Sequence, residues 1–337
     1  MKAIGYRESL PISDANALLD VTLPDPSPAG RDLLVRIKAV AVNPVDTKIR
    51  KRAQPEPGGI KVLGWDACGV VEAVGSECTL FKAGDEVWYA GAVNRQGTNA
   101  ELHLVDERIV GRKPRTLDDA HAAAMPLTTI TAWEILFDRL QIMPGKRDKG
   151  ECLLIVGAAG GVGSMLTQLA ARLTGLTVIG TASRAETRDW VLSLGAHHVI
   201  DHSKPLAAEL KNISVENVTH VAALTRSDLH LEQIIESLAP FGKLAMIDDP
   251  GPVDFTKLKT KSISLHWELM FTRALFQTAD MIEQHRLLNE VAALVDAGLI
   301  RSTFQEHYGK INAENLKRAH AMIESGKSMG KIVLEGF

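Results

Sequence analysis

The sequence predicts an α/β protein that combines a doubly wound parallel sheet with a second domain rich in β-strands. Between residues 152 and 266, six apolar segments alternate with mostly helical patterns. A glycine-rich turn at 157–163 follows the first of these segments. Before about residue 110, short strand-like segments are broken by Gly and Pro. Repeated strand–helix units force parallel pairing through right-handed crossovers, which is the architecture of a doubly wound sheet.

The composition is that of a globular protein without an obvious polymeric partner. The 337 residues suffice for about two domains. The net charge of −3 gives no bulk attraction to nucleic acid or anionic lipid. No apolar run reaches the roughly 18 residues that a membrane span needs, and the N-terminus lacks a signal-peptide core. The three cysteines are too few and too scattered for a disulfide framework, so we expect a cytoplasmic protein with no nucleic-acid or membrane partner.

The β-rich domain is predicted from spaced strand segments near the N-terminus. The clearest lie at 33–43, 69–75, 84–91 and 100–107. Strands spaced in this way indicate a compact, partly closed β domain. Two further helical patterns follow at 274–299 and 312–326, and a strand-like segment closes the chain at 330–337. We expect this tail to return to the first domain.

The alternating region supplies the parallel sheet. Its strands are expected at 152–156, 177–181, 197–200, 217–224, 243–247 and 262–266. The first helix is indicated by apolar residues at helical spacing, namely Val162, Met165, Leu166, Leu169 and Leu173. The second helical pattern, at 184–195, ends on Gly195, a residue typical of helix C-termini. Cys68 and Cys152 are expected as small buried apolar side chains.

The glycine turn has the composition of a phosphate-binding turn. Glycine allows a tight turn and lets the backbone approach a ligand closely. The first N–H groups of the following helix lack intrahelical partners and, with the helix dipole, suit a pyrophosphate. A turn that only packs the helix on the strand is the alternative. The expected dinucleotide-binding residues here are Gly157, Ala159, Gly160, Gly161, Val162 and Gly163.

The residues at the end of the second strand indicate whether the fold would bind NAD(H) or NADP(H). An NAD-preferring fold usually carries an acidic residue there, to bind the ribose 2′-hydroxyl. Here Ser183 and Arg184 hold that place, and Arg188 follows one helical turn later. A hydroxyl and a guanidinium suit a 2′-phosphate, which favours NADPH. Glu186 opposes this interpretation because of its charge, and a solvated helix start would also explain both arginines.

The sequence resembles the medium-chain dehydrogenase/reductase superfamily, and within it the zinc-free quinone oxidoreductase branch, whose members are often described as zinc-type alcohol dehydrogenase-like. The segments that carry the resemblance are AVNPVDTKIR (41–50), LGWDACGVVEAVG (63–75), FKAGDEVW (81–88), PLTTITAWEIL (126–136), GAAGGVG (157–163) and GKSMGKIVLEGF (326–337). The resemblance implies a GroES-like β-barrel catalytic domain over 1–125, completed by 270–337, and a Rossmann NADPH-binding domain over 126–269.

A homodimer is also implied by the resemblance. The apolar segment 262–271 would place a strand at the edge of the Rossmann sheet. Such a strand can pair with its copy across a two-fold axis.

The residues aligned with the family's zinc ligands argue against a metal. Zinc-dependent relatives place a Cys at the position of Asn43 and a His–Glu pair at those of Trp65 and Asp66. Catalytic zinc needs about three N, S or O ligands, and Asn and Trp are poor substitutes. The four-cysteine lobe of the structural zinc is absent from the sequence as well. We therefore expect no metal.

The resemblance assigns two of the candidate catalytic residues, Asn43 and Thr131, and the other two, Asp46 and Trp65, are chosen from the residues themselves. Asn43 would lie near the nicotinamide, with an Asx turn before Pro44 as the alternative. Asp46 would orient a neighbour or cap the following helix. Trp65 would line an apolar substrate cavity, although core packing is the commoner role of tryptophan. Thr131 would lie near the nicotinamide or bond a helix start.

The remaining cofactor-binding candidates come from the resemblance and from the position of the strand ends. His202 stands where relatives often have a tyrosine beside the adenosine 2′-phosphate. Leu224, Thr225 and Ile247 follow the fourth and fifth strands, and carboxyl ends of parallel strands form the ligand crevice. Met329, Gly330 and Lys331 match a family segment that returns to the nicotinamide pocket, although a strand-start lysine is an equal alternative for Lys331.

The expected function is NADPH-dependent reduction of a quinone or an α,β-unsaturated carbonyl. Such acceptors spread the incoming charge onto their own oxygen, so orientation and hydrogen bonding suffice without a metal. A zinc-dependent alcohol dehydrogenase is one alternative. An NADPH-binding protein with a structural or regulatory role is another.

Overall fold

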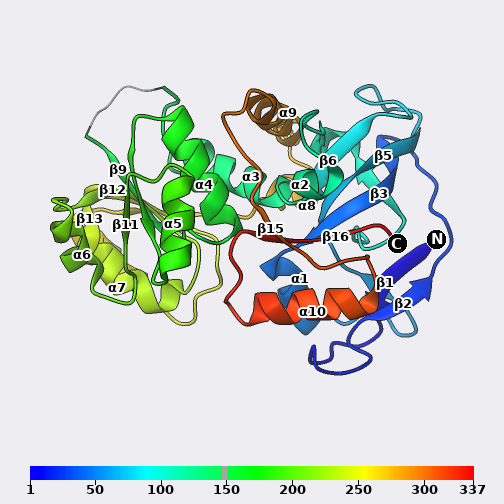
Figure 1. Cartoon of the computed structure of the whole chain (residues 1–337), viewed down its shortest axis with the longest axis horizontal. Coiled ribbons are helices and arrows are strands. Elements are labelled where there is room, and N and C mark those ends of the chain that lie inside the picture. The colour runs from blue at the N-terminus through cyan, green and yellow to red at the C-terminus, as the bar shows by residue number, and fades with distance from the viewer. Residues whose placement is uncertain (146–149) are drawn as a thin grey trace. The chain divides into compact units, whose positions relative to one another are not determined.

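The computed structural model describes residues 1–145 and 150–337, which form two compact units. The first unit comprises Met1–Ile130 and Phe271–Phe337, and the second comprises Thr131–Met270. Both chain ends therefore belong to the first unit, seen in blue and red in Figure 1. No helix among the described residues is both long enough and apolar enough to cross a bilayer.

The first unit is built mainly of antiparallel strands. Its strands are β1 (Lys2–Tyr6), β2 (Leu19–Thr22), β3 (Asp32–Val42), β4 (Lys61–Val62), β5 (Asp66–Val74), β6 (Glu86–Ala90), β7 (Leu102–Asp106), β8 (Val110–Arg112), β15 (Phe304–His307) and β16 (Lys331–Glu335). A three-stranded sheet has the order β2-β1-β4. A seven-stranded sheet runs β15-β16-β3-β5-β6-β8, with β7 paired to β3. The four strand segments expected near the N-terminus are confirmed as β3, β5, β6 and β7.

Strand β3 organises this unit because it pairs with three other strands. Its first part alternates between buried and more exposed residues, and its last four residues are all buried. In the antiparallel pair with β16, Val42 lies opposite Ile332. In the pair with β5, Ala41 lies opposite Asp66. The ends of β3 and the starts of β5 and β16 therefore meet at one place.

Five helices complete the first unit, and a sixth straddles the division between the units. They are α1 (Pro44–Arg52), α2 (Asp119–Ala123), α8 (Thr272–Phe276), α9 (Glu283–Asp296) and α10 (Ala313–Glu324), with α3 (Pro126–Trp133) at the division and a 3₁₀ turn at Glu107–Ile109. The sequence predicts one continuous helical pattern over 274–299, and this prediction is wrong because two separate helices, α8 and α9, form there. Gln277 adopts a left-handed conformation with φ of 46°, which ends α8 before α9 begins.

The second unit holds the parallel sheet. Its strands are β9 (Cys152–Val156), β10 (Thr177–Thr181), β11 (His198–Ile200), β12 (Val218–Ala223), β13 (Leu238–Met246) and β14 (Ser264–Trp267). Their order is β11-β10-β9-β12-β13-β14, and every neighbouring pair is parallel. This is the strand order of a doubly wound dinucleotide-binding fold, with the chain reversing direction across the sheet between β9 and β12. The predicted fold class is confirmed.

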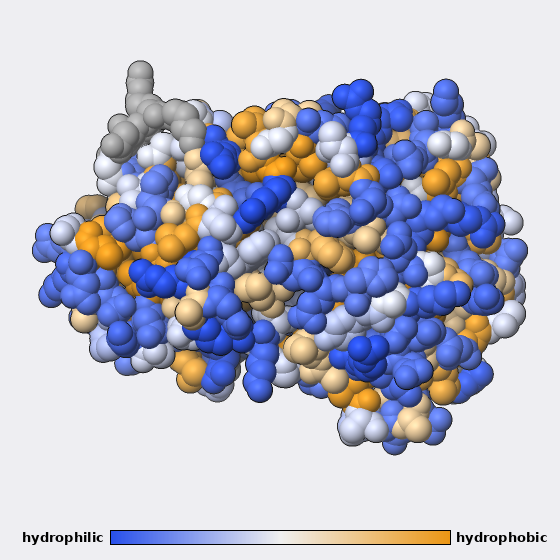
Figure 2. Space-filling view, viewed as in Figure 1, coloured by the Kyte–Doolittle hydropathy of each residue, from blue (hydrophilic) through white to orange (hydrophobic). Residues whose placement is uncertain are grey.

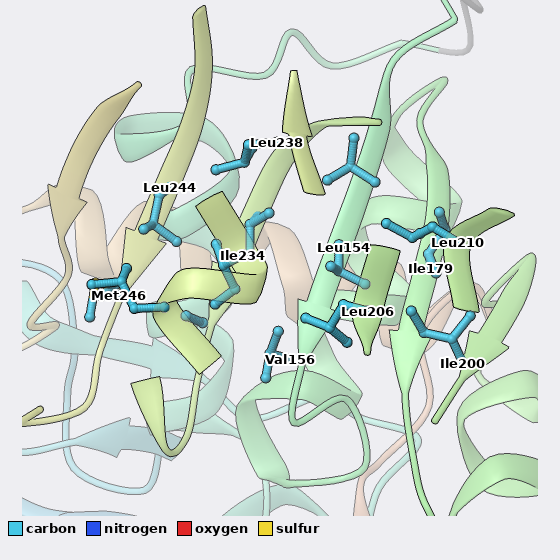
Figure 3. Packing of buried hydrophobic residues seen from close by; sticks show 14 of the residues in the cluster. Leu154, Val156, Ile179, Ile200, Leu206, Leu210, Ile234, Leu238, Leu244 and Met246 are labelled. Atoms are coloured by element: carbon cyan, nitrogen blue, oxygen red, sulfur yellow. The ribbon is translucent and has the colours of Figure 1, made fainter. Parts of the chain in front are cut away.

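Helices cover the parallel sheet. They are α4 (Gly161–Leu173), α5 (Ala185–Ser193), α6 (Leu206–Asn212) and α7 (Ser227–Ser237), with a π-helical turn at Glu134–Arg139 and a 3₁₀ segment at Phe255–Lys261. Figure 3 shows side chains from β9, β10 and β13 gathered with Leu206, Leu210 and Ile234 of α6 and α7. This cluster is shielded from water, and burying it stabilises the sheet by about 25 cal/mol per Å² of apolar area.

Two further expectations need correction. Strand β13 begins at Leu238, five residues before the expected start at 243, because Leu238 pairs with Val218 of β12 ahead of an irregularity in the register. Cys152 is half-buried rather than buried, because it starts the strand β9, whereas Cys68 is fully buried as expected. On the face in Figure 2, hydrophilic residues cover most of the surface and apolar residues form separate small patches.

Candidate functional site

The glycine turn of the second unit joins β9 to α4 with little room for side chains. Gly157 has φ of +89°, a conformation that favours glycine. A Cβ on Gly163 would lie 2.4 Å from the carbonyl oxygen of Gly157. Gly160 is the N-cap of α4, and Gly161 is its first residue. The first N–H groups of a helix lack intrahelical acceptors, so this turn presents bare amides at the positive end of the helix dipole.

The carboxyl ends of neighbouring strands bring further predicted residues to this turn. The Leu224 N–H donates to the Val156 carbonyl at the end of β9 (3.1 Å), and the Ile247 N–H donates to the Ala223 carbonyl (3.4 Å). A Cβ on Gly157 would meet the Thr225 methyl at 2.8 Å. Leu224 and Thr225 therefore stand beside the glycine turn, and Ile247 lies next to β12 at the same sheet edge, where such folds bind ligands.

The polar residues after β10 are exposed. Ser183, Arg184 and Arg188 all lie on the surface where β10 leads into α5. Arg184 forms an ion pair with Glu186 at 3.2 Å, and both side chains are largely exposed. Arg188 donates from Nη1 to the Val199 carbonyl of β11 at 2.7 Å. Arg188 is thus already bonded to the neighbouring strand, and the Arg184 guanidinium is paired with the Glu186 carboxylate.

Two residues beyond these strand ends have definite partners. The His202 ring meets the His230 ring edge-on, with centroids 5.9 Å apart, and among the described residues its Nδ1 has no hydrogen-bond partner. Asp248, which follows β13, accepts from the backbone N–H of Ser227 at 2.8 Å and from its hydroxyl. Asp248 therefore fixes the start of α7, a role that the sequence did not suggest.

The first unit contains a buried polar centre formed by Asn43, Asp46, Asp66 and Lys331. The Lys331 ammonium donates to the Asn43 oxygen at 2.5 Å and to Asp66 Oδ2 at 2.8 Å. The Asn43 amide nitrogen donates to the same Asp66 oxygen at 2.8 Å. Asp66 Oδ1 accepts from the Leu127 N–H at 2.7 Å. All four polar residues are at least 97% buried.

Asp46 joins this centre through the start of α1. Its Oδ2 accepts from the Asn43 N–H at 2.7 Å, which satisfies an orphan donor at the helix N-terminus. Burial raises the pKa of Asp46 to about 7, although the Asn43 N–H and the Lys331 charge both act in the opposite direction. Its Oδ1 is buried and lacks a hydrogen-bond partner within the described chain.

Three of the four predicted catalytic residues lie in the first unit, and the structure unites only two of them in this centre. Asn43 and Asp46 are in contact, whereas Trp65 is buried in the core and packs edge-on against Phe271 at 6.0 Å. Thr131 is buried in α3. Of the predicted tail residues, Lys331 enters the centre.

The other two tail residues lead the chain up to Lys331. Met329 is half-buried, and Gly330 makes a turn with φ of +55°. Asp66 was missed as a site residue. The signal for it is an acidic residue that opens an otherwise apolar strand, in DACGVV.

The donor set does not fit a catalytic zinc ion. Within residues 1–145 and 150–337, no group of three or more His, Cys, Asp or Glu side chains is placed to hold a metal. The position aligned with the family's first zinc ligand holds Asn43, and the Lys331 ammonium already lies against Asp66. Zinc prefers thiolate and imidazole ligands, and this centre offers an amide, two carboxylates and a cation.

Comparison with known proteins agrees with the fold. The family model "Alcohol dehydrogenase GroES-like domain" matches residues 29–115, and the model "Zinc-binding dehydrogenase" matches residues 194–334. A zinc-type alcohol dehydrogenase-like protein of Staphylococcus epidermidis is 36% identical over 99% of both chains. The chain belongs to the medium-chain dehydrogenase/reductase superfamily, a superfamily of oxidoreductases.

Two solved structures are similar over the whole chain. A proposed zinc-dependent alcohol dehydrogenase from Rhizobium etli CFN 42 has a TM-score of 0.96 and 56% identity, and the match covers 100% of this chain and 98% of that one. The Escherichia coli quinone oxidoreductase, complexed with NADPH, has a TM-score of 0.85 and 26% identity, with 99% and 100% covered.

Proposed function

We propose that this protein is an NADPH-dependent reductase of quinones or α,β-unsaturated carbonyls that works without a metal ion. The observation that carries the proposal is the pairing of two features in one chain. The second unit has a glycine turn shaped for a dinucleotide at the strand reversal of its sheet. The first unit has a polar centre whose cation is a lysine. The similar quinone oxidoreductase that was solved with NADPH supports the same activity.

The chain's own residues would bind and orient the cofactor, which supplies hydride when bound. The amides of 161–163 would hold the pyrophosphate, and the turn residues Gly157, Ala159 and Gly160 would leave space for it. Ser183 and Arg184 would bind the 2′-phosphate, with Arg188 and His202 nearby. Leu224, Thr225 and Ile247 would form the wall beside the cofactor.

The acceptor class follows from the donor chemistry. Oxidation of a simple alcohol develops an alkoxide, and stabilising it requires a strong electrophile such as a metal ion. A quinone or enone disperses the added charge onto its own oxygen, so hydrogen bonding and orientation lower the barrier enough. The catalytic assignments of Asn43, Asp46, Trp65 and Thr131, and the cofactor-lining roles of Met329 and Gly330, belong to this proposal.

The proposal includes a homodimer and a cytoplasmic location. Strand β14 lies at the end of the strand order, and Trp267 and Leu269 are each about half exposed there. An exposed edge strand with apolar side chains is a surface that proteins usually cover.

The decisive experiment measures NADPH oxidation by the purified protein with a panel of quinones and enones. We expect sustained turnover, faster with NADPH than with NADH, in protein whose zinc content is well below one ion per chain. Turnover of alcohols that depends on stoichiometric zinc would instead support an alcohol dehydrogenase. Tight NADPH binding without turnover of any acceptor would support a binding protein and contradict the proposal.

A further inference from the structure

The polar centre of the first unit has the form of an occupied cation site. Two oxygens contact the Lys331 ammonium directly, from Asn43 at 2.5 Å and from Asp66 at 2.8 Å. The Asp46 carboxylate accepts from the Asn43 N–H at 2.7 Å, so it lies next to Asn43. Asp46 Oδ1 is buried and has no hydrogen-bond partner among the residues described. The ammonium therefore has one carboxylate and one amide oxygen in direct contact, and a second carboxylate, that of Asp46, adjoins Asn43.

The sheet register brings Lys331 into this centre from the far end of the chain. Strand β16 runs antiparallel to β3 with Ile332 opposite Val42, so Lys331 lies opposite Asn43. The Lys331 N–H is anchored on the Thr303 carbonyl at 2.9 Å. A Cβ on Gly330 would lie 2.5 Å from that same carbonyl, so the turn before Lys331 is closely packed. The ammonium is thus held by the backbone as well as by its partners.

The charges around Asn43 determine which way its amide faces. An ammonium group only donates hydrogen bonds, and a carboxylate only accepts them. The Asn43 oxygen must therefore face Lys331, and its nitrogen must face Asp66. The ammonium and the carboxylate therefore favour the same orientation of the amide, one from each side.

We propose that Lys331 is a built-in cation, which takes the place of a metal ion in this centre and positions Asn43 and Asp66. Lys331 is a positioning residue in this proposal, because it acts through the groups that it contacts. A covalently attached ammonium needs no free ion, and it neutralises a buried carboxylate that would otherwise be costly. The inference concerns the first unit alone and does not depend on NADPH turnover.

A double-mutant cycle tests the charge pairing. We compare Lys331→Met, Asp66→Asn and the double variant by thermal unfolding, with Lys38→Met as a control for an exposed lysine on β3. Each single change should lower the Tm by about 10 °C, because it leaves a buried charge unpaired. The double variant should recover at least half of that loss, and the control should match the wild type.

Each outcome of the cycle is decisive. A Lys331→Met protein that fails to fold, next to a double variant that does fold, supports the pairing. A Lys331→Met protein as stable as the wild type would overturn it. The pairing would also be overturned if the Tm of the double variant fell by the sum of the two single decreases, or if the double variant did not fold.

Manganese uptake tests the cation position itself. Lys331→Ala, prepared and dialysed with Mn²⁺, should retain about one ion per chain, detected by electron paramagnetic resonance, because oxygen ligands suit this ion. The wild type and the Lys331→Ala/Asp66→Asn variant should retain none. If Lys331→Ala retains no more Mn²⁺ than the wild type, the lysine does not stand in a cation site.

Discussion

At the scale of single residues, burial sets the chemistry of the first unit's polar centre. Asp46 is 1% exposed, and its Oδ1 lacks a hydrogen-bond partner within the described residues. Desolvation penalises the charged carboxylate, and this raises its pKa to about 7. A folded-state pKa above the unfolded value means that the folded protein binds the proton more tightly. Asp46 therefore stabilises the fold in acid, and that contribution is lost as the pH rises through about 7.

Replacing Asp46 by Asn should remove this pH dependence. Asn keeps an oxygen that accepts the Asn43 N–H, and it has no charge to bury. Relative to wild type, we expect Asp46→Asn to gain more thermal stability at pH 8 than at pH 5, because at pH 5 the folded carboxyl is still protonated and the stabilisation is only partly lost. Thermal unfolding at both pH values measures the difference. Asp189→Asn, which changes an exposed carboxylate of α5, serves as control, and an equal gain at both pH values would contradict the prediction.

Cofactor preference is also a property of single residues. Arg184 is exposed and forms an ion pair with the exposed Glu186, so a 2′-phosphate can compete with that carboxylate for the guanidinium. Arg184→Ala should weaken NADPH binding about tenfold or more, since a charge-assisted hydrogen bond is lost, and should leave NADH binding nearly unchanged. Titration calorimetry with both cofactors provides the measurement.

The matched control for Arg184 is another exposed arginine of the same unit. Arg172→Ala, near the end of α4, should change neither affinity. If Arg184→Ala weakens the binding of NADPH and of NADH equally, Arg184 does not bind the 2′-phosphate.

At the scale of elements, the turn between β9 and α4 depends on the absence of side chains. A Cβ on Gly163 would lie 2.4 Å from the Gly157 oxygen and 2.6 Å from the Ala158 Cα. Both contacts are with backbone, which cannot move aside without shifting the turn. Helix α4 and strand β9 are therefore held at a distance that only glycine at position 163 permits.

A single added methyl group should disturb this turn. We expect Gly163→Ala to weaken NADPH binding about tenfold or more, which corresponds to about 1.4 kcal/mol. Gly251→Ala is the matched control, because a Cβ there would meet no atom within 4 Å. Calorimetry and thermal unfolding of both variants distinguish lost binding from lost folding. Unchanged affinity in folded Gly163→Ala would contradict the assignment of this turn to the cofactor.

At the scale of the whole molecule, the feature to explain is the β14 edge of the parallel sheet, which pairs with no further strand among the described residues. Strand β14 pairs with β13 on one side and ends the strand order on the other. Trp267 is 51% exposed and Leu269 is 52% exposed. Covering such an edge with a second copy removes both the open hydrogen-bonding groups and the apolar surface.

A charge on this edge should disrupt the proposed dimer. We expect light scattering at micromolar concentration to give twice the chain mass of 36.6 kDa for the wild type. Trp267→Lys should shift the mass toward that of one chain. Phe276→Lys, at an exposed aromatic of α8 in the first unit, should not. A wild type with the mass of a single chain would remove the dimer from the proposal.

Local patterns predicted much of the second unit. The expected strands 152–156 and 177–181 coincide with β9 and β10, because apolar runs next to glycines and helical repeats leave few alternatives. The break between α8 and α9 could not be predicted, since Gln277 has no intrinsic preference for its left-handed conformation. The start of β13 was missed for a similar reason, because pairing with neighbouring strands outweighed the weak local propensity.

The sequence by itself determined the strand–helix alternation, the glycine turn and the expectation of a dinucleotide, since each depends on residues close together in the chain. Only the tertiary structure decided that Lys331 joins Asn43 and Asp66, which lie 288 and 265 residues away. The physical reason is that a buried charge must find a partner, and the partner available is set by the register of β16 on β3.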